Sequence, residues 1–307
     1  MKNILNRTKV VILAIMALVL FSACTPKKTV QVQGDVNKEN TIKITVTFYP
    51  LYVLLSNITD GIEGVELSVL APADTGCLHD YQLTTKDMKK IEDCDILVAN
   101  GSGMEDFIEK ILSTKKDSLI LATEGFGLVD NNSHVWVSPQ GAIYETQKIV
   151  EGLVHLNPEN AAKYVQNGNA YLAKLEELTK YMHSMLDEYK GKKIVTFHEA
   201  FPYFASEFGL EIASVIEREP GEVPGPKELK EQIEEINSIL AAGNKIALFA
   251  EPQYSSKAAE IIAKETGLKV YELDPCVTGD FNSATLKDSY IINMKKNAEV
   301  LKEALAD

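Results

Sequence analysis

The sequence predicts an α/β protein made of two small lobes with mostly parallel strands, joined by one long helix. Three observations predict this class. Short apolar runs alternate with helical stretches, a similar set of runs recurs in the second half, and a long amphipathic segment separates the two sets. The length of 307 residues suits two domains, so we expect a packed core in each lobe.

Residues 41–156 are predicted to form the first lobe. Ile44, Val46 and Phe48 alternate with polar residues, which is the period of a half-buried strand. The apolar runs that predict its strands are Lys43–Phe48, Leu67–Leu70, Ile96–Ala99 and Leu119–Ala122. Helices are expected between them at Met88–Glu92 and Met104–Leu112. Such alternation favours parallel pairing.

Residues 157–190 carry the clearest helix signal. Asn157 is a good N-cap, Pro158 suits the first helical position, and Gly191 lies where a C-terminal glycine belongs. One apolar stripe follows spacings of four and three, through Tyr171, Leu175, Leu178, Met182, Met185 and Tyr189. The stripe has only six positions, and Gly168 lies in the interior of the segment. Both features argue against a free coiled coil. We therefore expect a rigid element of roughly 48 Å that joins the lobes.

Residues 191–307 are predicted to repeat the pattern of the first lobe. The expected strands are Lys193–Phe197, Ile212–Val215, Ile246–Ala250 and Val270–Leu273. The expected helices are Glu228–Leu240, Ser256–Glu265 and Leu286–Leu305.

The N-terminus predicts export and a lipid anchor. Three basic residues precede twelve apolar residues, Val10–Phe21, too few to span a membrane but typical of a signal peptide. Phe21-Ser22-Ala23-Cys24 resembles the bacterial lipobox, although Leu is usual in place of Phe21. We expect residues 1–23 to be removed, Cys24 to carry lipid, and residues 24–40 to form a flexible tether. The alternative is an ordinary secretory cleavage site beside a chance cysteine.

The charge balance bears on partners. The chain has 31 basic and 44 acidic residues, a net charge of −13, and this argues against nucleic acid because phosphate binding uses clustered Lys and Arg. An acidic surface is compatible with a soluble carrier or with a protein that handles cations.

Three of the five histidines and one aspartate are the candidate metal ligands. His79, His134, His198 and Asp274 all lie in predicted loops, and the last two follow predicted strands, where α/β folds place ligand sites. Their spacing is unlike a zinc finger, but loops of both lobes can converge in a cleft. His155 and His183 are interpreted as solvated surface residues.

Four motifs around these candidates occur in an order typical of one family. They are Leu78-His79-Asp80-Tyr81 with Asp95–Gly101, then His134–Pro139, then Phe197–Phe204, and finally Glu251-Pro252-Gln253 with Leu273-Asp274-Pro275. Behind a lipobox, these motifs resemble the solute-binding lipoproteins that serve zinc and manganese ABC importers. The resemblance covers nearly all of the chain from Ile44 onward. Leu78 and Ser138 depart from the Pro and Asp common in that family.

The resemblance implies two four-stranded lobes bridged by one long helix, and a metal site of three imidazoles and one carboxylate. It implies a monomeric receptor, not an enzyme, that delivers its metal to an ABC permease and its ATPase. Manganese-type members tend to have Glu at the third position, where this chain has His198, and imidazole suits zinc. We therefore expect zinc in preference to manganese.

Other residues near these candidates have open roles. Glu251 and Glu199 could each orient a ligating imidazole, or Glu251 could cap a loop and Glu199 be solvated. Cys77 and Cys276 each lie two residues from a candidate ligand, and they could form a disulfide, remain thiols or bind the metal. Cys94 is expected to be a small buried side chain.

Two other classes of function remain open. Three histidines with one open position would suit an extracellular zinc hydrolase, but Asp274 would fill that position and no HExxH motif is present. A surface adhesin that keeps a structural metal is the second alternative.

Overall fold

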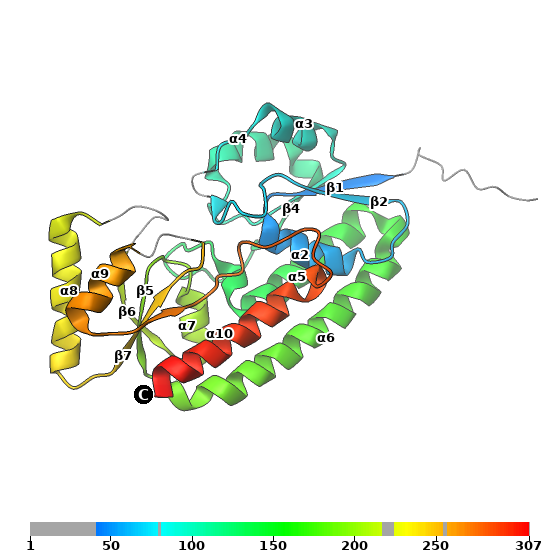
Figure 1. Ribbon diagram of the computed structural model, residues 1–307. Coiled ribbons are helices and arrows are strands. Elements are labelled where there is room, and N and C mark those ends of the chain that lie inside the picture. Colours follow the sequence, from blue (N-terminus) through cyan, green and yellow to red (C-terminus); the bar gives the residue numbers. More distant parts are fainter. Residues whose placement is uncertain (1–40, 79–80, 217–223, 254–256, 307) are drawn as a thin grey trace, which may run out of the picture. The chain divides into compact units, whose positions relative to one another are not determined.

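Two parallel sheets form the framework (Figure 1). Each has four strands, and both have the same strand order. The computed structural model describes residues 41–78, 81–216, 224–253 and 257–306. The first sheet has the order β2-β1-β3-β4 and the second β6-β5-β7-β8. The strands are β1 (Ile42–Val46), β2 (Val65–Val69), β3 (Ile96–Ala99), β4 (Leu119–Leu121), β5 (Lys193–Thr196), β6 (Glu211–Val215), β7 (Ile246–Ala250) and β8 (Val270–Glu272). Every pairing is parallel, which confirms the predicted class.

This strand order creates one switch point in each sheet. In the first sheet β1 lies between β2 and β3, so the connection from β1 to β2 runs toward one edge and the connection from β2 to β3 crosses back toward the other edge. In the second sheet β5 lies between β6 and β7 in the same way. Loops at the carboxyl ends of such strands are where α/β folds bind ligands. His198 follows β5 and Glu251 follows β7, so both side chains lie at the switch point of the second sheet.

Nine α-helices are assigned within the described residues. They are α2 (Tyr49–Ile58), α3 (Thr85–Asp93), α4 (Glu109–Leu112), α5 (Pro139–Leu156), α6 (Ala161–Leu186), α7 (Pro202–Phe208), α8 (Pro226–Ala241), α9 (Lys257–Thr266) and α10 (Ser289–Ala306). The helices α2, α5 and α7 are not predicted from the sequence pattern. Each has a proline in its first two positions, a start signal that the apolar pattern alone does not register. No helix in the described part of the chain is long and apolar enough to cross a membrane.

The long helix is present where the sequence predicts it. The 3₁₀ turns Pro158–Asn160 and Asp187–Tyr189 extend α6 at both ends into a helical segment of 32 residues. Its predicted stripe is mostly buried, and Gly191 has a left-handed φ of 77°. Asn157 is the N-cap residue, as predicted, but its side chain makes no capping hydrogen bond, because Asn157 Oδ1 accepts instead from Tyr164 Oη at 2.8 Å and from Asn160 Nδ2 at 2.9 Å. The buried Tyr164 hydroxyl needs an acceptor.

The two sheets share a hydrophobic core. α6 packs against α2, α5 and α10 (Figure 1), and one continuous cluster of buried residues includes Val46 of β1, Leu175 of α6 and Phe249 of β7. A Cβ at Gly168 would lie 2.5 Å from Val150 Cγ2, so glycine lets α5 and α6 approach closely. Each sheet also has a smaller cluster of its own, under α8 and α9 in the second sheet and under α3 in the first. The expected core in each lobe is therefore present only in part, because α2, α5, α6 and α10 join most of the buried apolar surface of both sheets into one cluster.

Two carboxyl groups are buried beside the first sheet. Glu105 Oε1 accepts from Thr47 Oγ1 and Asn100 N, both at 2.8 Å, and Oε2 accepts from Gly101 N at 2.8 Å. Burial raises the pKa of Glu105 to about 7. This turn shortens the helix predicted at Met104–Leu112, which is α-helical only from Glu109. Burial, and secondly the charge of Glu105, raises the pKa of Glu145 on α5 well above its ordinary value.

Glu145→Gln is expected to reduce the loss of stability at rising pH. The folded state holds the Glu145 proton above the ordinary pKa of 4.5, whereas the unfolded chain releases it. The free energy of unfolding therefore falls with rising pH, by up to about 1.4 kcal/mol per pH unit, until the folded-state pKa is reached. Urea unfolding from about pH 4 to 8 should show that the free energy of unfolding falls less steeply with pH in the variant than in the wild type. Glu151 is exposed on the same helix, and for Glu151→Gln the free energy of unfolding should change with pH as in the wild type. The same pH dependence as wild type in Glu145→Gln would show that the Glu145 proton does not contribute to stability.

Candidate metal centre

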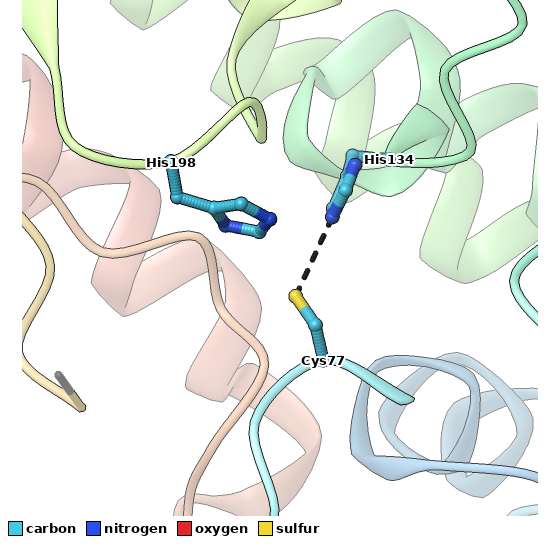
Figure 2. Close-up of side chains that lie close together, drawn as sticks. All are labelled: Cys77, His134 and His198. Atoms are coloured by element: carbon cyan, nitrogen blue, oxygen red, sulfur yellow. Dashed lines mark hydrogen bonds between the residues drawn. The ribbon is translucent and has the colours of Figure 1, made fainter. Parts of the chain in front are cut away.

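Three side chains from distant parts of the sequence point toward one another (Figure 2). Cys77 lies in the loop after β2, His134 precedes the 3₁₀ turn Val135–Val137, and His198 follows β5. One donor atom from each lies within 4.8 Å of the other two. Cys77 Sγ is 3.4 Å from His134 Nε2, and the two imidazole centroids are 4.7 Å apart. All three side chains are buried, so a metal ion held here would be shielded from water.

Two of the four predicted ligands are in this group, and His79 lies outside the described residues. The fourth, Asp274, is not among the three grouped side chains. Its Oδ1 accepts from Cys276 N at 2.7 Å and its Oδ2 from Asn293 Nδ2 at 3.0 Å. Burial raises the pKa of the Asp274 carboxyl. The roles of His79 and Asp274 as ligands stay predictions.

A buried carboxylate accompanies His198. Glu251 Oε1 lies 3.3 Å from His198 Nδ1, and Glu251 Oε2 accepts from Gln253 Nε2 at 2.6 Å. A carboxylate beside the ring nitrogen that faces away from a metal is the arrangement that orients a ligating imidazole. The Glu199 side chain is exposed, and the backbone carbonyl of Glu199 is the group directed toward the site region.

Sequence analysis missed Asn132, which contacts His134. Asn132 Oδ1 accepts from His134 Nδ1 at 3.0 Å and from His134 N at 2.9 Å. An Asn two residues before another residue commonly binds that residue's backbone amide in an Asx turn, and this is the local signal that could have identified it. Its contact with the imidazole depends on the tertiary structure.

The other described cysteines and histidines lie outside the group. Cys94 and Cys276 are buried thiols, and Cys94 Sγ donates to Ile91 O at 3.2 Å, as a small core residue would. His155 is exposed, and His183 Nδ1 lies 2.8 Å from Asp187 Oδ1 on α6 and its extension. Both fit the surface role predicted for them.

The sequence of the chain is similar to those of known zinc-binding proteins. Residues 44–304 match the family described as ZnuA, zinc-uptake complex component A, periplasmic. The zinc-binding protein AdcA of Streptococcus pyogenes serotype M3 is 30% identical over 86% of this chain. The zinc-binding lipoprotein AdcA of Streptococcus pneumoniae is 29% identical over 95% of this chain. The chain spans 56% and 60% of the length of these two relatives.

Solved structures show the same fold. The FpvC solute-binding protein of Pseudomonas aeruginosa, in complex with Mn²⁺, has a TM-score of 0.76 and 29% identity, covering 87% of this chain and 98% of its own. Zn(II)-bound AdcA from Streptococcus pneumoniae has a TM-score of 0.74 and 29% identity, covering 87% of this chain and 58% of its own. The matched family consists of transport components, so the hydrolase alternative is wrong. The chain belongs to the ZnuA family of metal solute-binding proteins of ABC uptake systems.

Proposed function

We propose that this chain captures zinc in preference to manganese outside the cytoplasm and delivers it to an ABC permease and its ATPase. The observation that carries the proposal is the convergence of Cys77, His134 and His198 from loops of both sheets. Two imidazoles and one sulfur suit zinc, whereas manganese prefers oxygen ligands. AdcA with Zn(II) and FpvC with Mn²⁺ are both similar, so the donor set of this chain carries the choice of metal.

The full ligand set is proposed to add His79 and Asp274 to the two described histidines. Each Asp274 oxygen accepts one hydrogen bond, from Cys276 N or Asn293 Nδ2, and keeps a second lone pair for a bond to the metal. Cys77 lies where it could ligate directly or take the place of a more distant donor. With Cys77 there are five candidates for the four positions of a closed tetrahedral zinc site, so Cys77 or one of the other four would remain outside the coordination shell.

Cys77→Ser is expected to reduce the preference for zinc over manganese. A soft thiolate favours zinc, and a serine oxygen at the same place removes that bias while retaining a small polar side chain. We expect zinc affinity to fall while manganese affinity changes less. Competitive titration with both metals measures the ratio. Cys94→Ser, which changes a buried thiol in another core cluster, should leave the ratio unchanged; an unchanged ratio in Cys77→Ser would argue against sulfur near the metal.

Delivery is proposed to depend on anchoring. Lipid on Cys24 and a tether up to residue 40 would keep the protein close to its permease and raise the effective concentration. Export, lipidation and the monomeric state belong to this proposal, and the segment that carries Cys24 lies outside the described residues.

The decisive experiment combines metal analysis with growth. Protein purified without chelator should contain zinc, and a strain that lacks the chain should grow poorly under zinc chelation and recover when zinc is added. Manganese-loaded protein with growth rescued only by manganese would reverse the choice of metal. Normal growth without a second carrier, together with metal-free protein, would contradict the transport proposal.

A further inference from the structure

Asn132 connects the two parts of the candidate site. Its Oδ1 accepts from both His134 Nδ1 and His134 N, and its Nδ2 donates to Glu199 O at 2.7 Å. Glu199 directly follows His198 in the chain. One carboxamide therefore contacts one imidazole of the group and the loop that carries the other.

These contacts fix how the carboxamide is oriented. A backbone N–H can only donate and a carbonyl oxygen can only accept. Oδ1 must therefore face His134 N, and Nδ2 must face Glu199 O, because the flipped orientation would place donor against donor and acceptor against acceptor. Since Oδ1 can only accept, the Nδ1 of a neutral His134 must carry the proton. Its Nε2, which faces Cys77, is then the nitrogen that offers a lone pair.

The backbone around Asn132 is held by the second half of the chain. Tyr203 Oη donates to Asn132 O at 2.6 Å and accepts from Val129 N at 3.2 Å. Asp130 and Asn131 have left-handed φ angles of 50° and 57°, a conformation that costs free energy in residues other than glycine and that Asp and Asn tolerate best. Tyr203, on α7, closes this turn and thereby sets the position of Asn132.

We propose that Asn132 is a positioning residue that selects the Nδ1–H tautomer of His134 and holds that imidazole in register with the His198 loop. The proposal rests on the proposed function for its consequence, since only a metal-binding protein needs both imidazoles in register. The Asn132 side chain then links metal capture to the position of the His198 loop relative to His134. A movement of the His198 loop would pull on Asn132 and misalign His134, which favours release.

The test uses the full chain and zinc. Asn132→Ala should abolish the preference for the Nδ1–H tautomer, read by nitrogen NMR of the apo protein at about pH 8.5, where imidazoles are neutral. It should also weaken zinc binding by about 10- to 100-fold with unchanged stoichiometry. Asn132→Asp keeps an oxygen acceptor opposite His134 Nδ1 and should therefore show the Nδ1–H tautomer, as the wild type does. Tyr203→Phe should keep the tautomer and speed zinc dissociation by about 2- to 10-fold, as expected for one lost hydrogen bond.

A matched control separates positioning from stability. Asn167 on α6 also bridges distant backbone, donating to Ile58 O at 3.1 Å and Asp60 O at 2.9 Å, so Asn167→Ala should lower stability without changing tautomer or affinity. An unchanged tautomer and affinity in Asn132→Ala would overturn the proposal, and unchanged dissociation in Tyr203→Phe would overturn the link to the second half. The tautomer is measured without metal, so its result stands even if the wild type fails to bind zinc, which would instead refute the proposed function.

Discussion

Replacing His198 by alanine should lower zinc affinity by about 100-fold or more. Zinc held by four protein ligands is bound with an apparent free energy of about 10–16 kcal/mol, so one ligand accounts for about 3 kcal/mol, and 100-fold is about 2.8 kcal/mol. The variant also leaves the buried Glu251 carboxylate without the imidazole 3.3 Å away. Competition against a zinc-binding dye at neutral pH measures the change.

The controls for this prediction come from the same chain. His155→Ala removes an exposed imidazole at the end of α5 and should bind zinc like the wild type. Asp274→Asn tests the fourth ligand, because a ligating carboxylate should cost a similar factor when lost. Wild-type affinity and stoichiometry in His198→Ala would remove His198 from the site, whatever the result for Asp274→Asn.

Trp136→Ala should destabilise the apo protein by about 3–5 kcal/mol, a large share of the stability of an ordinary domain. Trp136 is 1% exposed and packs edge-on against Phe48, with ring centroids 5.0 Å apart. Its Nε1 donates to Pro275 O at 2.9 Å, and its carbonyl accepts from Tyr290 Oη at 2.8 Å. Removing the indole of Trp136 opens a cavity where the loop after β4 meets the chain after β8. Urea unfolding in the presence of chelator measures the loss.

Two other substitutions should destabilise the protein less than Trp136→Ala does. Trp136→Phe keeps a ring against Phe48 but removes the donor to Pro275 O, and an unsatisfied buried carbonyl costs about 1–3 kcal/mol. Val165→Ala changes a side chain of α6 that is 41% exposed, and it should shift stability by less than about 0.5 kcal/mol. If Trp136→Ala unfolded at the same urea concentration as wild type, the shared core would not depend on this contact.

Local patterns predicted most of the fold. Each of the eight predicted strands coincides with an observed strand to within two residues, and α6 lies where the stripe beginning at Tyr171 places it. The strands follow from short apolar runs, which are almost continuously buried in β3 and β7, and the long helix follows from its apolar stripe. Both signals are local properties of the sequence. Three helices that start at proline directly after a loop, α2, α5 and α7, are not among the elements predicted from the apolar pattern.

The sequence by itself determined the two sets of strands, the long helix between them and His134 and His198 as candidate ligands. Only the tertiary structure decided that Cys77 joins these histidines, that Asn132 orients one of them, and that both sheets share one core. Cys77 and His134 are 57 positions apart, and no local pattern encodes their distance of 3.4 Å. That distance depends on the order of the strands in each sheet and on how α5, α6 and α10 pack against both, because these contacts place the loops relative to one another.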